Sequence, residues 1–430
     1  MTRVEPLPDP AGPVPSFRPH ASDDPTTVPP VLRRRASSTV VALALLGSLA
    51  ACSASDSEGS TTTSIAGSSG ATTTTEAADL GSEAAYEDRG PNEVGTHSFA
   101  LADGRRVVTW YPAADSAAEQ PTESFDIASL LTPELQGEIP ADKRPLYEID
   151  AHPGADPAAD GPYPVVLFSH GYAGFPEQSA DLVTHLASWG FVVVAPDHVE
   201  RSLSGLLGVA ARGVPKLEDP AVLSQSLDAV IADSERAESP LNGMVDVDKV
   251  AVAGHSAGAG ASYREASQEL RIKAFIAYSI GIGDPDGGEE PPPVPTVPGM
   301  VMAGTDDGII AFDASEQVYD GMGAPKYLVS IEGAGHLVFS DLCLIGRDLG
   351  GLAGLIEEVG LDLPEQFSRL ASDGCEDDQL DPLKAFGAID HLSVAFLRSV
   401  FGIDEEPVGL DPSVTEAFTD AEITLTADPG

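Results

Sequence analysis

The sequence predicts an α/β protein with a mostly parallel central sheet and helices on both of its faces. Two observations support this. Short, continuous apolar runs such as 191–195 alternate with amphipathic helical patterns, as expected where helices connect parallel strands. Another apolar run, 250–253, breaks into Gly254-His255-Ser256-Ala257-Gly258 and then into a helix of small residues. The chain of 430 residues is long enough for one such domain and a separate N-terminal segment.

The individual elements follow from apolar spacing and from the Gly and Pro residues that bound each run. The predicted strands are 106–111, 164–169, 191–195, 249–253, 272–280, 299–303 and 326–331. Helical spacing predicts helices at 177–189, 219–236 and 385–401, and a weaker one at 127–135. The proline-rich or acidic stretches 113–161 and 284–298 are expected to be excursions from the sheet, and 204–213 a loop or lid.

The N-terminal part of the chain has the composition of an export signal. Arg33, Arg34 and Arg35 precede the short apolar stretch 40–46, which is followed by Leu49-Ala50-Ala51-Cys52. The apolar stretch is too short to span a membrane as a helix. The segment that follows it consists almost entirely of Ser, Thr, Gly, Ala and acidic residues, which is typical of a flexible tether.

The sequence Leu-Ala-Ala-Cys resembles a bacterial lipobox, in which the cysteine is diacylated and becomes the mature N-terminus. Cys52 is then a lipid anchor that holds an exported protein on the outer face of the bacterial cytoplasmic membrane. A plain secretory signal is the alternative. The expected organisation is a disordered start plus lipoprotein signal peptide at 1–51, a tether at 52–90, the folded α/β domain at 91–405 and an acidic C-terminal tail at 406–430.

The charge of the chain excludes some classes of partner. With 23 basic and 68 acidic residues, the formal net charge is -45, so nucleic acid is not expected to bind. The acidic cluster between Asp373 and Asp381 is expected to be a solvated loop, with a calcium site as the alternative. Because the chain has no HExxH, paired CxxC, P-loop or GxGxxG motif, we expect no metal and no cofactor. We also expect a monomer.

Two cysteines remain when Cys52 is assigned to the anchor. An exported protein lies where disulfides persist, so Cys343 and Cys375 are expected to pair. In the chain-entropy model, closing such a loop stabilises the fold by about 3–4 kcal/mol. The alternative is a pair of buried free thiols.

The Gly254–Gly258 sequence has the form of a nucleophile elbow. A serine hydroxyl is a weak nucleophile, so it must project from a sharp turn where a histidine can accept its proton and backbone N–H groups can face the oxyanion. Glycines on either side allow that turn to pack closely against its neighbours. Ser256 is therefore the candidate nucleophile of a serine hydrolase.

The acid and the base are expected at the carboxyl ends of later strands. The strand 299–303 leads into Asp306 and Asp307, and the strand 326–331 leads into His336. The order nucleophile, acid, histidine is that of α/β-hydrolase triads. Asp307 is preferred as the acid, because it is followed by Gly308 in the usual acid turn, and Asp306 is the alternative.

The predicted strand 164–169 leads into Ser169-His170-Gly171-Tyr172-Ala173-Gly174, where an oxyanion loop is expected. We assign the oxyanion hole to the backbone N–H groups of Tyr172 and Ala257. Tyr172 and Phe175 are candidate substrate-binding residues, although Phe175 could equally pack beneath the loop. His170 and His255 are expected to hydrogen-bond these loops rather than to act as the base.

Several of these segments together resemble one branch of the α/β hydrolases, the platelet-activating-factor acetylhydrolases and dienelactone hydrolases. They are Val108–Pro112, Phe168–Gly171, Phe191–His198 and Gly254-His255-Ser256. Bacterial polyester hydrolases and cutinases are similar in the same segments. The resemblance implies the α/β-hydrolase fold and hydrolysis of carboxylic esters through an acyl-enzyme without a cofactor, with Ser256, Asp307 and His336 as the triad.

The elbow alanines Ala257 and Ala259 and the two excursions depart from the family pattern, which leaves the substrate open. A short-acyl or lipid ester is expected, with a polyester or a lipase substrate as the alternative. Peptidase or thioesterase activity would need the same machinery. A function of a different class is a lipid-anchored binding protein on a hydrolase scaffold.

Overall fold

The computed structural model describes residues 81–430 except 141–143, 145, 211–212, 284–290, 348–350 and 352–364. The chain divides into two units, Met1–Thr73 and Thr74–Gly430, and all described residues belong to the second. The predicted signal peptide, the predicted lipidation site Cys52 and most of the predicted tether lie outside the described residues. Across the described ranges, no helix is both long and apolar enough to cross a membrane.

A ten-stranded sheet organises the second unit, in the order β12-β11-β10-β9-β8-β6-β7-β2-β1-β5. Every neighbouring pair from β7 to β11 is parallel, whereas β1–β2, β2–β7 and β11–β12 are antiparallel. The mostly parallel sheet predicted from the sequence is therefore confirmed. The strands are β1 (Glu93–Ala100), β2 (Arg106–Ala113), β5 (His152–Pro153), β6 (Tyr163–Ser169), β7 (Val192–Pro196), β8 (Val245–His255), β9 (Ile272–Tyr278), β10 (Gly299–Gly304), β11 (Lys326–Ile331) and β12 (Ile423–Asp428).

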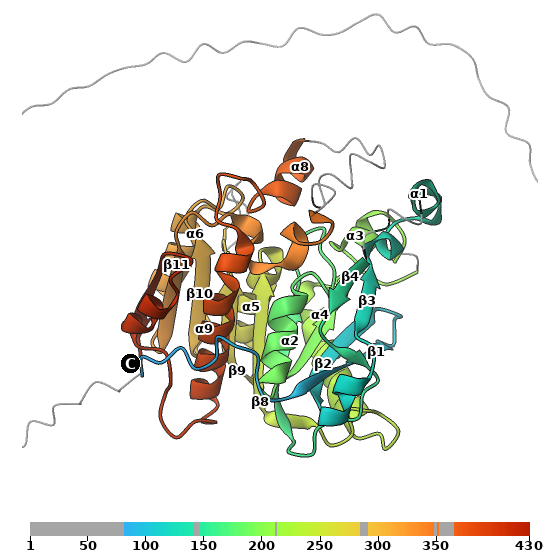
Figure 1. Cartoon of the computed structure of the whole chain (residues 1–430), viewed down its shortest axis with the longest axis horizontal. Helices are drawn as coiled ribbons and strands as arrows, with labels where there is room; N and C mark the ends of the chain where they lie inside the picture. Colours follow the sequence, from blue (N-terminus) through green and yellow to red (C-terminus); the bar gives the residue numbers. More distant parts are fainter. Residues whose placement is uncertain are drawn as a thin grey trace, which may run out of the picture. The chain divides into compact units, whose positions relative to one another are not determined.

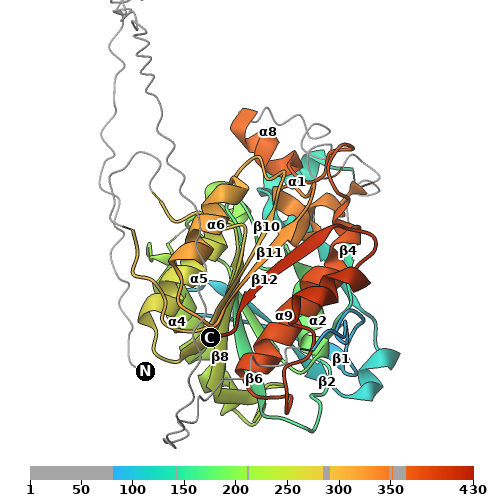
Figure 2. The ribbon, with the colours of Figure 1, turned by 90° about the vertical axis from the view of Figure 1, so that its left-hand side faces the viewer.

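Helices cover both faces of this sheet, as Figure 1 and Figure 2 show. On one face lie α4 (Asp219–Ser234), α5 (Ala257–Gln268) and α6 (Phe312–Gly321), and on the other α2 (Ala180–Ser188) and α9 (Phe386–Val400). Each face has its own cluster of buried hydrophobic side chains. Because the central strands are buried on both sides, they are apolar at every position rather than at every second one.

Shorter elements form the connections. The excursion after β2 contains a separate antiparallel hairpin, and its predicted helix at 127–135 is a 3-10 turn followed by a short α-helix that begins at Pro133. The other short elements are β3 (Glu123–Asp126), β4 (Leu146–Ile149), α1 (Pro133–Glu138), α3 (Leu203–Leu206), α8 (Glu365–Ser372), and 3-10 turns at Asp115–Glu119, Ile127–Leu130, His336–Phe339, Asp341–Cys343, Pro382–Lys384 and Pro412–Ala417.

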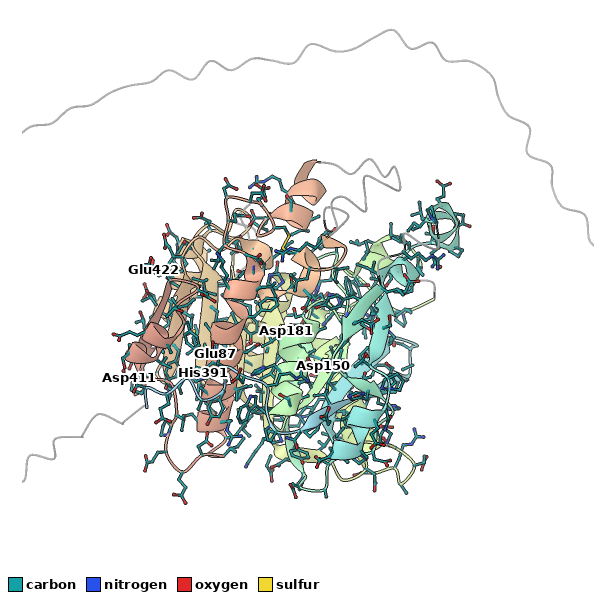
Figure 3. All side chains as sticks on the ribbon, in the orientation of Figure 1. Glu87, Asp150, Asp181, His391, Asp411 and Glu422 are labelled. Atoms are coloured by element: carbon teal, nitrogen blue, oxygen red, sulfur yellow. A yellow bond between two sulfur atoms is a disulfide. The ribbon has the colours of Figure 1, made fainter. Side chains whose placement is uncertain are left out.

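The folded domain begins before residue 91, which corrects the predicted end of the tether. The Tyr86 side chain is buried, its ring stacks on His391, and its backbone N–H donates to His391 Nδ1 over 3.1 Å. Figure 3 shows Glu87 and His391 close together on the face that carries α9. The residues around Tyr86 therefore cover α9, because an aromatic side chain in an otherwise polar segment gains free energy by burial there.

The predicted acidic tail at 406–430 is also wrong. Residues 423–428 form β12, which pairs antiparallel with β11 and is the edge of the sheet. Ile423 and Leu425 alternate with exposed neighbours and are buried, the pattern of a strand with one face on the core. The acidic composition of this segment masked that alternation.

Candidate active site

Ser256 lies at the sharp turn between β8 and α5, with φ 59° and ψ -121°. Such backbone angles are strained for a serine and persist only where the surroundings enforce them. The flanking glycines supply that close packing, since a Cβ on Gly254 would lie 2.4 Å from the Gly258 carbonyl oxygen, and one on Gly258 would lie 1.9 Å from that of Ser169. The Ser256 N–H donates to the Tyr278 carbonyl, 2.9 Å away, which fixes the turn to β9.

The structure brings together the three side chains predicted for the triad. His336 Nε2 lies 2.8 Å from Ser256 Oγ, and His336 Nδ1 lies 2.8 Å from Asp307 Oδ2. All three residues are buried. With the proton of the imidazole on Nδ1, the ring donates to Asp307 and can accept the serine proton at Nε2. This arrangement can activate a serine for attack on a carbonyl carbon.

Asp307, rather than Asp306, contacts the histidine. The other oxygen of its carboxylate, Oδ1, accepts hydrogen bonds from the N–H groups of Ile309 (2.9 Å) and Ile310 (2.7 Å). Burial alone would raise the pKa of Asp307, but the hydrogen bond and charge of His336 together with these two N–H groups lower it. Asp306 instead lies in the turn, where its N–H donates to the Ala334 carbonyl.

The predicted oxyanion loop lies beside the nucleophile. A Cβ on Gly171 would be 3.5 Å from Ser256 Cβ, so the backbone of this loop passes directly over the serine. Ala257 is the first residue of α5, where N–H groups have no acceptor within the helix. Tyr172 follows Gly171 and its side chain is 42% exposed. The loop and the start of α5 thus flank Ser256, as the proposed oxyanion donors require.

Phe175 does not line an open substrate site. Its side chain is only 1% exposed, and its ring stacks on Phe125 with the centroids 5.4 Å apart. It packs beneath the loop and joins the loop to the excursion after β2. Of the two interpretations left open by the sequence, packing is the one that the structure supports.

The Arg201 side chain donates hydrogen bonds to the predicted oxyanion loop, and no sequence pattern indicated this role. Its Nη1 donates to the carbonyl oxygens of His170 and Gly171, and its Nη2 donates to Ser169 Oγ over 2.8 Å. Asp219, at the start of α4, receives the Nε–H of this buried guanidinium. No spacing rule links a residue after β7 with the loop after β6, which is why sequence patterns did not reveal it.

Cys343 and Cys375 form a disulfide, as predicted, with their Cα atoms 5.2 Å apart. Cys343 follows the 3-10 turn that begins at His336, so the bridge is close in sequence to the candidate base. In the described part of the chain, no cluster of three or more His, Cys, Asp or Glu side chains is arranged to hold a metal ion.

Parts of the chain are similar to known proteins. Residues 153–299 match the chlorophyllase family model. Cutinase 1 of Thermobifida cellulosilytica is 31% identical over 121 residues, which are 28% of this chain and 40% of that protein. Chlorophyllase-2 of Arabidopsis thaliana is 27% identical over 33% of this chain and 42% of its own length. The chain thus spans less than half the length of these two relatives.

A putative carboxymethylenebutenolidase of Methylorubrum extorquens is 26% identical over 40% of this chain and 57% of its own length. The solved structure of a ferulic acid esterase from Streptomyces cinnamoneus superimposes with a TM-score of 0.50 over 80% of this chain and 99% of that one, at 18% identity. This last similarity supports the fold alone. The expected resemblance to esterases, including that to cutinases, is confirmed, and the chain has the α/β-hydrolase fold.

Proposed function

We propose that the protein is an exported serine hydrolase that cleaves carboxylic esters through an acyl-enzyme. The observation that carries the proposal is the unbroken hydrogen-bonded series from Ser256 through His336 to Asp307, with both distances at 2.8 Å. A non-catalytic binding protein on the same scaffold would not need a strained serine turn, a buried acid and an oxyanion loop in one place. The names of the similar proteins support the ester as the reacting group.

The proposed reaction proceeds in two halves. Ser256 Oγ attacks the ester carbonyl carbon while His336 Nε2 accepts the serine proton, and the backbone N–H groups of Tyr172 and Ala257 stabilise the oxyanion. His336 then gives the proton to the departing alcohol. In the second half, His336 accepts a proton from a water molecule that attacks the acyl carbon, and it returns this proton to Ser256 Oγ as the acid leaves. Asp307 keeps the imidazole oriented and stabilises its cationic form. Each oxyanion donor contributes about 3–4 kcal/mol to lowering the barrier.

The substrate proposed is a short-acyl or lipid ester. A polyester is the second candidate, and the similarity to cutinases favours it. Export follows from the arginines at 33–35, the apolar stretch 40–46 and the lipobox-like sequence that ends at Cys52. On this basis the mature protein is anchored to the membrane through a lipid on Cys52.

The test is hydrolysis of p-nitrophenyl esters of increasing acyl length by the full chain, beside the Ser256→Ala variant. Activity confined to short chains and absent from the variant supports the acetylhydrolase-like proposal. Activity on long chains and on polyester films, also absent from the variant, transfers support to the cutinase-like alternative. Equal rates with the variant would refute ester hydrolysis at this serine.

A further inference from the structure

A second carboxylate, Asp373, links the two loops that carry the candidate acid and base. It follows α8 directly, and only 8% of its surface is exposed. Its Oδ1 accepts the backbone N–H of His336 over 2.7 Å, and its Oδ2 accepts that of Gly308 over 3.1 Å. Gly308 is the residue next to Asp307. One buried carboxylate therefore connects the base itself with the neighbour of the acid.

The two loops approach Asp373 more closely than side chains would allow. A Cβ on Gly308 would lie 2.4 Å from Asp373 Oδ2, and a Cβ on Gly335 would lie 2.5 Å from the backbone nitrogen of Gly374. The carbonyl oxygen of Asp373 also accepts the N–H of Leu337 over 2.8 Å. Both loops are thus built around this segment, and glycine is required at each point of closest approach.

Two further contacts fix the segment itself. Cys375, just after Asp373, is joined by the disulfide to Cys343, which follows the turn of His336. On the other side, Arg369 Nη2 donates to the Gly308 carbonyl oxygen over 2.8 Å. The disulfide and the Arg369 hydrogen bond therefore fix the position of Asp373, whose carboxylate lies between the Asp307 turn and His336.

We propose that Asp373 is a positioning residue for the ester hydrolysis, setting the separation between Asp307 and His336; this rests on the function proposed above. The acid and the base come from the ends of different strands, β10 and β11, and their hydrogen bond depends on how the two loops lie. A misplacement of about 1 Å at a reacting group can lower the rate about 100-fold. A carboxylate that ties both loops together prevents such a shift.

The test compares Asp373→Asn with Asp233→Asn in the full chain. Asp233 is 7% exposed, and it lies near the end of α4 that leads into β8, at the opposite end of that strand from Ser256. An asparagine at 373 keeps one acceptor oxygen and turns an NH2 group toward the other N–H. We expect kcat on a p-nitrophenyl ester to fall about 10- to 100-fold with KM changed less than twofold, while Asp233→Asn keeps kcat within twofold.

A second variant approaches the same contact from the other loop. Gly308→Ala pushes Asp373 Oδ2 away but keeps the carboxylate. Gly308→Ala and Asp373→Asn should each lower kcat. Because both changes disturb one contact, the fold-decrease in kcat of the double variant should be much smaller than the product of the two single decreases. If Asp373→Asn retains kcat within twofold of the wild type, or if its loss matches that of Asp233→Asn, the proposal is refuted.

A measurement without substrate separates the positioning role of Asp373 from the proposed ester hydrolysis. It is the low-field NMR signal of the proton between His336 Nδ1 and Asp307. A wild type without esterase activity contradicts the proposed function alone. The signal must still shift or broaden in Asp373→Asn and stay unchanged in Asp233→Asn if Asp373 positions the pair. A signal that is unchanged in both variants overturns the positioning role.

Discussion

His255 Nε2 lies 2.9 Å from the backbone carbonyl oxygen of His336 and donates a hydrogen bond to it. On its other side, His255 Nδ1 accepts from Gln178 Nε2 over 3.1 Å, and Gln178 Oε1 accepts the N–H of Gly171 over 3.0 Å. Burial, with a smaller effect from His336, lowers the pKa of His255 to about 3, so the ring is neutral and carries one N–H. The buried side chains of His255 and Gln178 thus connect the proposed base His336 with the proposed oxyanion loop.

This connection predicts that Gln178→Leu lowers kcat about tenfold. The change leaves the N–H of Gly171 and Nδ1 of His255 without partners, and each buried unpaired group costs about 1–3 kcal/mol. The oxyanion loop then loses its link to the base. Steady-state kinetics measure the effect, with Gln136→Leu in the excursion after β2 as the control, which should keep kcat. Equal kcat in both variants would contradict a role for the connection.

Arg201 is expected to stabilise the fold, because its buried guanidinium pairs with the partly buried Asp219 carboxylate and donates to three acceptors in the oxyanion loop. Arg201→Met removes the donor to the His170 carbonyl oxygen and takes one partner each from the Gly171 carbonyl and the Asp219 carboxylate. Removing one partner of a buried ion pair costs about 3–5 kcal/mol. Urea unfolding should show this loss.

Arg271→Met is the matched control for Arg201→Met. Arg271 pairs with Glu269 and Asp228, but its side chain is one-third exposed, so the loss should stay below about 1 kcal/mol. Similar losses in the two variants would mean that the guanidinium of Arg201 contributes no more than a surface charge.

The choice between the two adjacent aspartates is tested by two isosteric changes. Asp307→Asn removes the charge beside His336 Nδ1 and should lower kcat on the order of 10⁴-fold, as the same change does in a Ser-His-Asp triad. Asp306→Asn keeps the backbone hydrogen bond to Ala334 and should leave kcat within about threefold. The measurement is kcat of ester hydrolysis by the two purified variants. A larger decrease in kcat for Asp306→Asn than for Asp307→Asn would make Asp306 the acid.

We expect the stability of the fold to depend on pH through the carboxyl group of Asp341. This fully buried carboxyl group accepts from the Tyr147 hydroxyl over 2.6 Å and from the N–H of Asp181 over 3.1 Å. Burial, and next the charge of Asp181, raise the pKa of Asp341 to about 7. Figure 3 shows Asp181 on the face of the sheet that carries α2. The buried carboxyl group of Asp341 thus lies near a second carboxylate, that of Asp181.

The unfolded chain releases this proton near pH 4, so the folded state binds more protons between about pH 4 and pH 7. The contribution of Asp341 is therefore fully present below about pH 4 and is lost as the pH rises through about 7. Denaturant unfolding at pH 5 and pH 8 should show a decrease in stability for the wild type and a smaller decrease for Asp341→Asn. An identical decrease in both proteins would contradict the raised pKa.

The sequence predicted the parts of this molecule whose signals are local. Continuous apolar runs mark the central strands because both faces of the sheet are covered, and glycines mark the elbow because a Cβ there would overlap the neighbouring backbone. The disulfide followed from the expected export of the chain. Ser256, His336 and Asp307 were each visible as a polar residue at the end of an apolar run.

The parts that the sequence did not predict depend on contacts between distant segments. Arg201, Gln178 and Asp373 hold loops from other strands, so nothing in their own surroundings in the sequence indicates a role. The edge strand β12 was missed because its exposed positions are acidic or polar and it alternates over only six residues. An edge strand with one solvent-exposed face lacks the continuous apolar run that identified the central strands.

The most direct test is covalent labelling of the full chain with a fluorophosphonate, followed by mass spectrometry of the peptide that contains Ser256. Such a reagent reacts with a serine only where a base has activated it and an oxyanion site receives the phosphoryl oxygen. We expect one adduct, on Ser256, that is abolished by His336→Gln. A wild type that remains unlabelled, or label on a different serine, would contradict the assignment of Ser256 as the nucleophile.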